Sequence, residues 1–176
     1  MRTAGELSGL AVVSDAAGER LGRVQDVLFE TSSGTITGLL VRTRGGLLAK
    51  SEFLPRLFVR RVGPDAVLVE AGAVLQEMPA QPDQSEGSGS GSTSAHALDG
   101  RPVLDVSGRV VGDVADVLID EVSLRVDALL LSGSFLGDLL HGKPRLPLAQ
   151  VQTLGQDSVV TAPGYDPKVA GTYPAR

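Results

Sequence analysis

The chain has 176 residues, of which 42% are hydrophobic, with no Cys, no Trp and a formal net charge of −5. This length allows one or two domains, and the absence of Cys excludes disulfide bonds and thiolate metal sites. Neither a signal-peptide core nor an apolar run of about 18 residues is present, so we expect a soluble, cytoplasmic protein without membrane insertion. The acidic balance and the scarcity of aromatic residues are not typical of a nucleic-acid-binding protein.

The second half of the chain repeats the first. Residues 21–30, LGRVQDVLFE, return as residues 111–120, VGDVADVLID, and Leu54-Pro55 returns as Leu146-Pro147. A repeat that continues through several elements indicates one small fold that has been duplicated. We predict two domains at residues 5–78 and 98–162, a flexible Gly/Ser linker at 79–97 and a disordered tail at 163–176.

The elements predicted in each copy are short strands separated by turns. Strands are expected at 10–13, 20–30, 36–42, 59–62 and 66–70 in the first copy, and at 103–104, 110–120, 126–131, 151–154 and 158–161 in the second. Regular short strands with Gly-rich turns between them predict an all-β protein made of two small barrels in tandem. Helix is expected only as a turn or two at 71–78 and as a short segment at 135–140.

Six residues are predicted to have structural roles at matched positions of the two copies. Gly18 and Gly108 end Asp-led turns that need a positive φ, and Gly22 and Gly112 mark bends in long strands. A carboxylate inside an apolar strand is costly to bury unless it is hydrogen-bonded, which makes Asp26 and Asp116 notable. Each Asp either contacts a ligand or partner, or accepts backbone N–H groups at a bulge where the register slips by one; we favour the bulge.

The spaced motifs resemble the PRC-barrel family. The motifs are an opening Leu-x-Gly, a Gly-x-x-x-Gly-x-Val-x-Asp-Val stretch, a Val/Leu-rich strand, a Leu-Pro pair and a closing Val-x-x-Val/Leu-Gly-x-Asp, and each occurs twice: Leu7 and Leu98, Gly18 and Gly108, Gly22 and Gly112, Val24 and Val114, Asp26 and Asp116, Pro55 and Pro147, Gly63 and Gly155, Asp65 and Asp157. The resemblance implies a small β-barrel that acts as a docking module. Relatives include the cytoplasmic part of the photosynthetic reaction-centre H subunit and the C-terminal domain of the ribosome-maturation factor RimM. We expect the chain to differ from both, without the membrane anchor of the former and without the separate N-terminal domain of the latter.

No pattern in the sequence points to catalysis. His96 and His141 lie far apart, no Gly-x-Ser-x-Gly elbow or phosphate-binding Gly motif occurs, and the carboxylates near Asp116 do not have the spacing of a calcium loop. We therefore expect no catalytic residue, no metal and no cofactor, and a protein that is not an enzyme.

The loop that varies between the copies is the candidate partner-binding site. It carries apolar side chains in both copies: Leu47 and Leu48 in the first, and Phe135, Leu136, Leu139 and Leu140 in the second. Such residues either cover the end of the barrel or bind a partner, in which case Phe135 and Leu139 would be the anchors.

The function expected from these features is a non-enzymatic protein-interaction or scaffold module with an unidentified protein partner or self-association. One alternative is a RimM-like ribosome- or RNA-associated factor, for which the first copy offers a group of basic residues: Arg42, Arg44, Lys50, Arg56, Arg60 and Arg61. A second alternative is an accessory protein of photosynthetic electron transfer, associated with the reaction centre.

Overall fold

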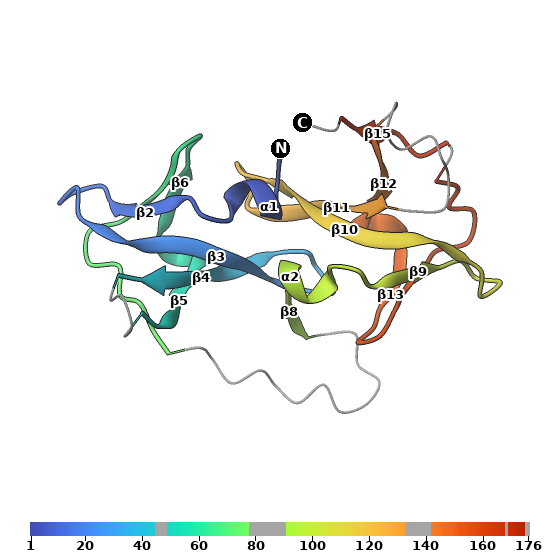
Figure 1. Ribbon diagram of the computed structural model, residues 1–176, viewed down its shortest axis with the longest axis horizontal. Helices are drawn as coiled ribbons and strands as arrows, with labels where there is room; N and C mark the ends of the chain where they lie inside the picture. Colours follow the sequence, from blue (N-terminus) through green and yellow to red (C-terminus); the bar gives the residue numbers. More distant parts are fainter. Residues whose placement is uncertain (45–48, 78–90, 133–141, 168, 175–176) are drawn as a thin grey trace.

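The computed structural model describes residues 1–44, 49–77, 91–132, 142–167 and 169–174. Within these ranges the chain is mostly β and forms two sheets, one for each copy, as Figure 1 shows. The predicted all-β class and the tandem arrangement are confirmed. The residues of the predicted partner-binding loops, Leu47, Leu48, Phe135, Leu136, Leu139 and Leu140, lie outside the described residues.

The first copy is a curled sheet with the order β5-β4-β3-β2-β7-β6. Its strands are β2 (Ala11–Ser14), β3 (Arg20–Glu30), β4 (Ile36–Thr43), β5 (Ser51–Pro55), β6 (Val59–Val62) and β7 (Ala66–Val69), with the 3-10 helix η2 (Arg56–Phe58) before β6. Neighbours are antiparallel except β2 and β7, which run parallel. Buried and exposed residues alternate over 22–25 of β3, whereas residues 27–29 of β3 and 38–41 of β4 are buried in succession.

The second copy repeats this topology strand for strand. Its strands are β9 (Pro102–Leu104), β10 (Val110–Asp120), β11 (Arg125–Ser132), β12 (Lys143–Pro147), β13 (Val151–Leu154) and β14 (Val159–Thr161), with the 3-10 helix η3 (Leu148–Gln150) before β13. The order β13-β14-β9-β10-β11-β12 and the single parallel pair, β9 with β14, match the first copy.

The two copies exchange their first strands. Strand β1 (Arg2–Thr3) pairs with β10 of the second copy, and β8 (Ser92–Ser94) pairs with β3 of the first. A one-turn helix follows each exchanged strand, α1 (Ala4–Leu7) and α2 (Ala95–Leu98), and each helix lies against the long strand of the other copy (Figure 1). The prediction that the linker extends to residue 97 is therefore wrong at its end, because 92–98 form β8 and α2.

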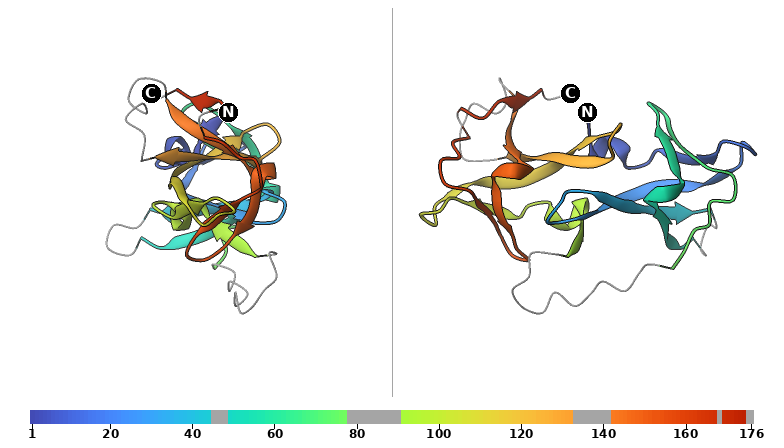
Figure 2. Two further views of the ribbon diagram at one scale, coloured as in Figure 1. Left: turned by 90° about the vertical axis from the view of Figure 1, so that its right-hand side faces the viewer. Right: turned by 180° about the vertical axis from the view of Figure 1, so that it is seen from behind.

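One hydrophobic core runs through both copies. Val24, Phe29 and Leu54 of the first copy belong to the same cluster of buried side chains as Leu98 and Ile119 of the second. Full burial of such a side chain contributes roughly 1.5–3 kcal/mol. The two sheets consequently form one elongated body, which Figure 2 shows from two further sides.

The prediction of a disordered tail is also wrong over its described part. Tyr165 is 9% exposed and its hydroxyl donates to the carbonyl of Arg145 at 3.3 Å. Burial, followed by the charge of Asp166, raises the pKa of Tyr165 to about 12. Strand β15 (Thr172–Tyr173) pairs with β12, and Tyr173 packs on a second small cluster, consisting of Leu118, Ala128 and Leu130. A sheet edge and an apolar patch thus order a segment whose own sequence is rich in Pro and Gly.

The helix expected at 71–78 is absent over the described residues 71–77. Gln76 instead forms a two-hydrogen-bond bridge with Phe53, at 2.7 and 2.8 Å. This bridge covers the outer edge of β5, and the contact outweighs a helix of at most two turns, which is marginal in water without packing.

Candidate functional site

A cleft of about 200 Å³ opens where the two copies meet. It lies between α1, α2, β3 and β10, and its walls are matched pairs of positions from the two copies: Ala4 and Ala95, Gly5 and His96, Ser8 and Asp99, Gln25 and Ala115, Asp26 and Asp116. Because each half of the cleft comes from a different copy, the cleft exists only where the two copies pack together. We call this contact region the joint, and the cleft the central cleft.

Asp26 and Asp116 each sit at a bulge of a long strand. The register slips between Val24 and Asp26 against β4, and between Val114 and Asp116 against β11. In each copy the carboxylate Oδ1 accepts the backbone N–H of the next residue at 2.8 Å. This is the bulge geometry expected from the sequence.

The same Oδ1 atoms also accept a hydrogen bond across the joint. Asp26 accepts the N–H of His96 at 3.1 Å, and Asp116 accepts the N–H of Gly5 at 3.2 Å. Both donors belong to the first turn of a helix, where backbone N–H groups have no partner within the helix. Each carboxylate therefore contacts the other copy as well as its own bulge.

Side-chain caps complete the start of both exchanged helices. Thr3 and Glu6 form a reciprocal capping box at α1, with hydrogen bonds of 3.2 and 2.8 Å. At α2, Ser94 accepts the N–H of Ala97 at 3.1 Å. Capping of this kind typically contributes about 1 kcal/mol, which helps to hold a helix of one turn in place.

The two halves of the central cleft differ in chemistry. His96 and Asp99 of the second copy stand where the first copy has Gly5 and Ser8. The cleft therefore presents three carboxylates and an imidazole, and no ion pair within the described ranges involves any of them. The described residues hold no group of three or more His, Cys, Asp or Glu that could bind a metal ion. Such a cleft can accept hydrogen bonds and receive a cationic group.

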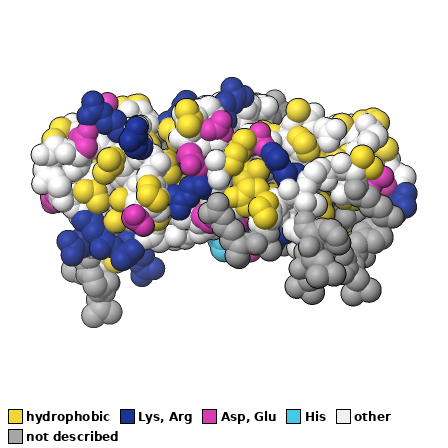
Figure 3. Space-filling model, turned by 90° about the horizontal axis from the view of Figure 1, so that it is seen from above, with side chains coloured by type: hydrophobic (Ala, Val, Ile, Leu, Met, Phe, Trp, Pro, Cys, Tyr) yellow, Lys and Arg dark blue, Asp and Glu magenta, His cyan; other side chains and the backbone are white. Residues whose placement is uncertain are grey.

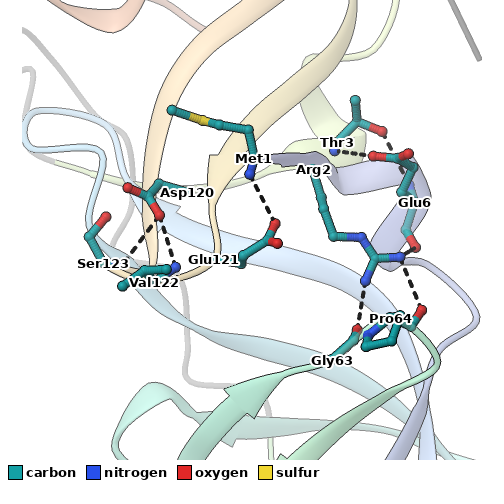
Figure 4. A network of polar contacts seen from close by, with 10 residues as sticks. All are labelled: Met1, Arg2, Thr3, Glu6, Gly63, Pro64, Asp120, Glu121, Val122 and Ser123. Carbon is teal, nitrogen blue, oxygen red and sulfur yellow. Dashed lines mark hydrogen bonds and ion pairs between the residues drawn. The ribbon is translucent and has the colours of Figure 1, made fainter.

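Polar contacts at the joint reinforce the exchange, as Figure 4 shows. The amino group of Met1 lies 3.3 Å from Oε2 of Glu121, and the Arg2 guanidinium donates to the carbonyls of Gly63 at 2.6 Å and Pro64 at 3.2 Å. In the second copy Arg101 binds the carbonyl of Gly155 in the same way, although Arg2 and Arg101 are not matched positions of the repeat.

The strand and turn glycines occupy positions that a side chain would disturb. Gly18 and Gly108 have φ of 62° and 80° and end the predicted turns. A Cβ on Gly22 would come within 2.7 Å of Val41 Cγ1, and one on Gly112 within 3.0 Å of the Ser132 carbonyl. Gly22 and Gly112 thus allow the neighbouring strand to approach closely.

The basic residues expected to form a patch in the first copy do not stay together. Arg60 pairs with Asp15, and Arg56 donates to the carbonyl of Ser123 at 2.8 Å across the joint. Arg42, Arg44 and Lys50 lie at one end of the β4–β5 hairpin. Arg23, which the sequence reasoning missed, is directly opposite Arg42. The alternation of residues 22–25 predicts that Arg23 is exposed, but only the pairing of β3 with β4 shows that it lies beside Arg42.

Comparison with known proteins agrees with this architecture. The family model described as PRC-barrel domain matches residues 1–76 and again residues 91–166, so the second match includes the exchanged strand β8. No curated protein matches the chain. Within the described ranges no helix has the length and apolar character needed to cross a bilayer. The chain belongs to the PRC-barrel domain family and carries two tandem copies of that domain.

Proposed function

We propose that this protein is a non-enzymatic interaction module that holds a protein partner against the joint between its two barrels. The central cleft supports this proposal most directly, because both copies build it and its walls come from the elements that they exchange. A partner bound in the central cleft would contact both barrels at once, so its binding would require the two barrels to be packed together. The sequence adds that no nucleophile, cofactor or metal motif competes for this assignment.

The chemistry of the central cleft favours a basic side chain of the partner. Asp26, Asp99 and Asp116 line it, and the first and third already use Oδ1 to hold the joint. A Lys or Arg entering the cleft would make charge-assisted hydrogen bonds, which are roughly twice as strong as neutral ones. The surrounding wall residues Ala4, Ala95 and Ala115 are small and leave room for the aliphatic stem of such a side chain.

The test is capture of partners by the tagged full chain from its native cells, with mass spectrometry as the readout. Asp99→Arg should abolish capture of the specific partner, because it places a cation in the cleft without touching the bonds made by Asp26 and Asp116. Asp99→Ser is the matched control for folding, since the fold already accepts Ser8 at the equivalent position. A photo-crosslinking residue at position 8 should attach to the same partner.

The loop residues remain a prediction from the sequence and can be separated in the same experiment. Loss of capture in Phe135→Ser/Leu139→Ser, with normal capture by Asp99→Arg, would assign binding to the loop instead of the central cleft. Failure of the full chain to capture any specific protein would remove the interaction module itself.

A further inference from the structure

Four cations gather on the outer face of the first copy's sheet, at one end of the molecule. Arg23 on β3 lies directly opposite Arg42 on β4, and Arg44 lies two residues farther along the chain. Lys50 is held beside them because Thr43 and Lys50 bind each other through backbone and hydroxyl hydrogen bonds of 2.9–3.2 Å. We call Arg23, Arg42, Arg44 and Lys50 the basic face; Lys and Arg side chains gather at the lower left of Figure 3.

The sheet can form without the charges of the basic face, although the Arg23 guanidinium also donates to the carbonyl of Gly9 at 2.5 Å. Like charges directly opposite on neighbouring strands are destabilising. All four side chains are exposed, and none forms an ion pair with another described residue. At the positions that match Arg23 and Arg42, the second copy has Asp113 and Ser132, which pair in the same register. The same strands therefore form without the cations.

An aromatic ring shares this face of the sheet. Arg42 pairs with Ser51 on β5, and Phe53 lies two residues farther along that strand, on the same side. The Phe53 ring covers Gly38, whose missing side chain makes room for it, and Phe53 remains partly exposed. Its backbone is fixed on both sides, by β4 and by the bridge to Gln76. The Phe53 ring is thus held in place over Gly38, on the same face of the sheet as Arg42.

We propose that the basic face binds single-stranded nucleic acid, with phosphates on its arginines and a base stacked on Phe53. Guanidinium forks match phosphate oxygens in a bidentate geometry, and a cationic surface with an aromatic platform is how sequence-tolerant single-strand binding works. An anionic bilayer would attract the same cations but offers no base for the fixed ring of Phe53. The basic face shares no residue with the central cleft, so substitutions in it test this proposal separately from the proposed function.

The first experiment measures binding of the full chain to fluorescent single strands of about 12 nucleotides, oligo-U RNA and oligo-dT DNA, by anisotropy. If three arginines each neutralise one phosphate, log Kd should change with log salt with a slope of about 2. Binding should then weaken by roughly 20-fold between about 50 mM and about 200 mM NaCl. The RNA and DNA arms show whether the 2′-hydroxyl contributes.

The second experiment uses substitutions at exposed or partly exposed positions, and Arg42→Ser introduces the residue that the second copy has at Ser132. Arg42→Ser/Arg44→Ser should reduce the salt slope to about a third, because one phosphate contact remains. Phe53→Leu should weaken binding about tenfold through the lost stacking. Arg109→Ser/Lys143→Ser removes two positive charges from the second copy and should leave affinity within about twofold of the unmodified chain.

Three outcomes would overturn the proposal. The first is no binding of either strand at low salt. The second is an equal loss of affinity in Arg42→Ser/Arg44→Ser and in Arg109→Ser/Lys143→Ser, since binding would then follow net charge alone. The third is binding to phosphatidylserine vesicles that depends on Arg42 and Arg44 while oligonucleotides do not bind, which would assign the face to a lipid surface.

Discussion

The carboxylate of Asp26 accepts the backbone N–H of His96 at 3.1 Å, joining a strand bulge of one barrel to the first turn of a helix that begins the other. Asp116 and Gly5 repeat the contact in the opposite direction at 3.2 Å. The pair of contacts makes the joint a reciprocal one, in which each copy satisfies a helix terminus of the other. Several properties of the protein should depend on this reciprocity.

Removal of either carboxylate should destabilise the whole protein. Asp26→Ala leaves the N–H groups of Val27 and His96 without their acceptor, and we expect a loss of about 1–3 kcal/mol in the free energy of unfolding, measured in urea. Asp116→Ala should lose a similar amount. Asp26→Asn, which keeps an acceptor oxygen, is the control and should lose less. An unchanged urea midpoint for Asp26→Ala would show that water replaces the carboxylate at no cost.

The two halves should remain together after the chain between them is cut. We expect a chain with a protease site introduced within residues 78–90 to elute after cleavage as one species of unchanged size, because β1 and β8 are each paired with the sheet of the other copy and the core is shared. Size-exclusion chromatography with light scattering measures this directly. Separation into two monomers at neutral pH would mean that the exchanged strands contribute little to association.

The close approach of β3 and β4 should make Gly22 sensitive to a single added methyl group. The Cβ of Gly22→Ala would meet Val41 Cγ1 at 2.7 Å as well as the backbone of Arg42, so we expect a loss of about 1–3 kcal/mol in thermal or urea unfolding. Gly171→Ala is the matched control because no atom lies within 4 Å of its Cβ position, and it should change stability by about 0.5 kcal/mol or less. Equal stability of the two variants would contradict the tight packing.

The carboxylate of Asp105, in the turn before β10, should titrate at unusually low pH. The hydroxyl of Ser107 and the backbone N–H of Arg109 bind the Asp105 carboxylate and lower its pKa from 3.8 to about 2. Because the folded pKa is depressed, the stabilising contribution is complete above pH 3.8 and is lost as the pH falls through about 2. Ser107→Ala, which introduces the residue that the first copy has at Ala17, should move the pKa of Asp105 back toward 3.8, as measured by NMR titration. An unshifted titration would exclude the hydroxyl as the main cause.

Most of the fold could be predicted from the internal repeat of the sequence. Residues 20–30 and 110–120 show the same apolar spacing and the same central Asp, and this predicted two matching long strands, each with a bulge. The long strands could be read because their periodicity extends over many residues. The opening segments could not be read in this way. Strand β1 has two residues and β8 has three, and the neighbouring Gly/Ser run made 92–97 resemble linker.

The candidate site was predicted less well. Asp26 and Asp116 were recognised as paired positions, but His96 was assigned to the linker and Gly5 to the extreme edge of the first domain. The four residues come together only because the exchanged strands place each helix over the other copy's bulge. The basic residues were also predicted incompletely. In the sequence Arg56 and Arg60 could not be told apart from Arg42, but in the structure Arg56 binds the carbonyl of Ser123 and Arg60 pairs with Asp15.

The sequence by itself determined that this protein is a duplicated, small all-β fold, because strand alternation, turn glycines and their repetition are local properties that survive without coordinates. Only the tertiary structure decided that the duplicates exchange their first strands, share one core and enclose a central cleft. The physical reason is that a strand of two or three residues carries no periodic signal of its own. Its place depends on which sheet edge offers unpaired N–H and C=O groups, and here that edge belongs to the other copy.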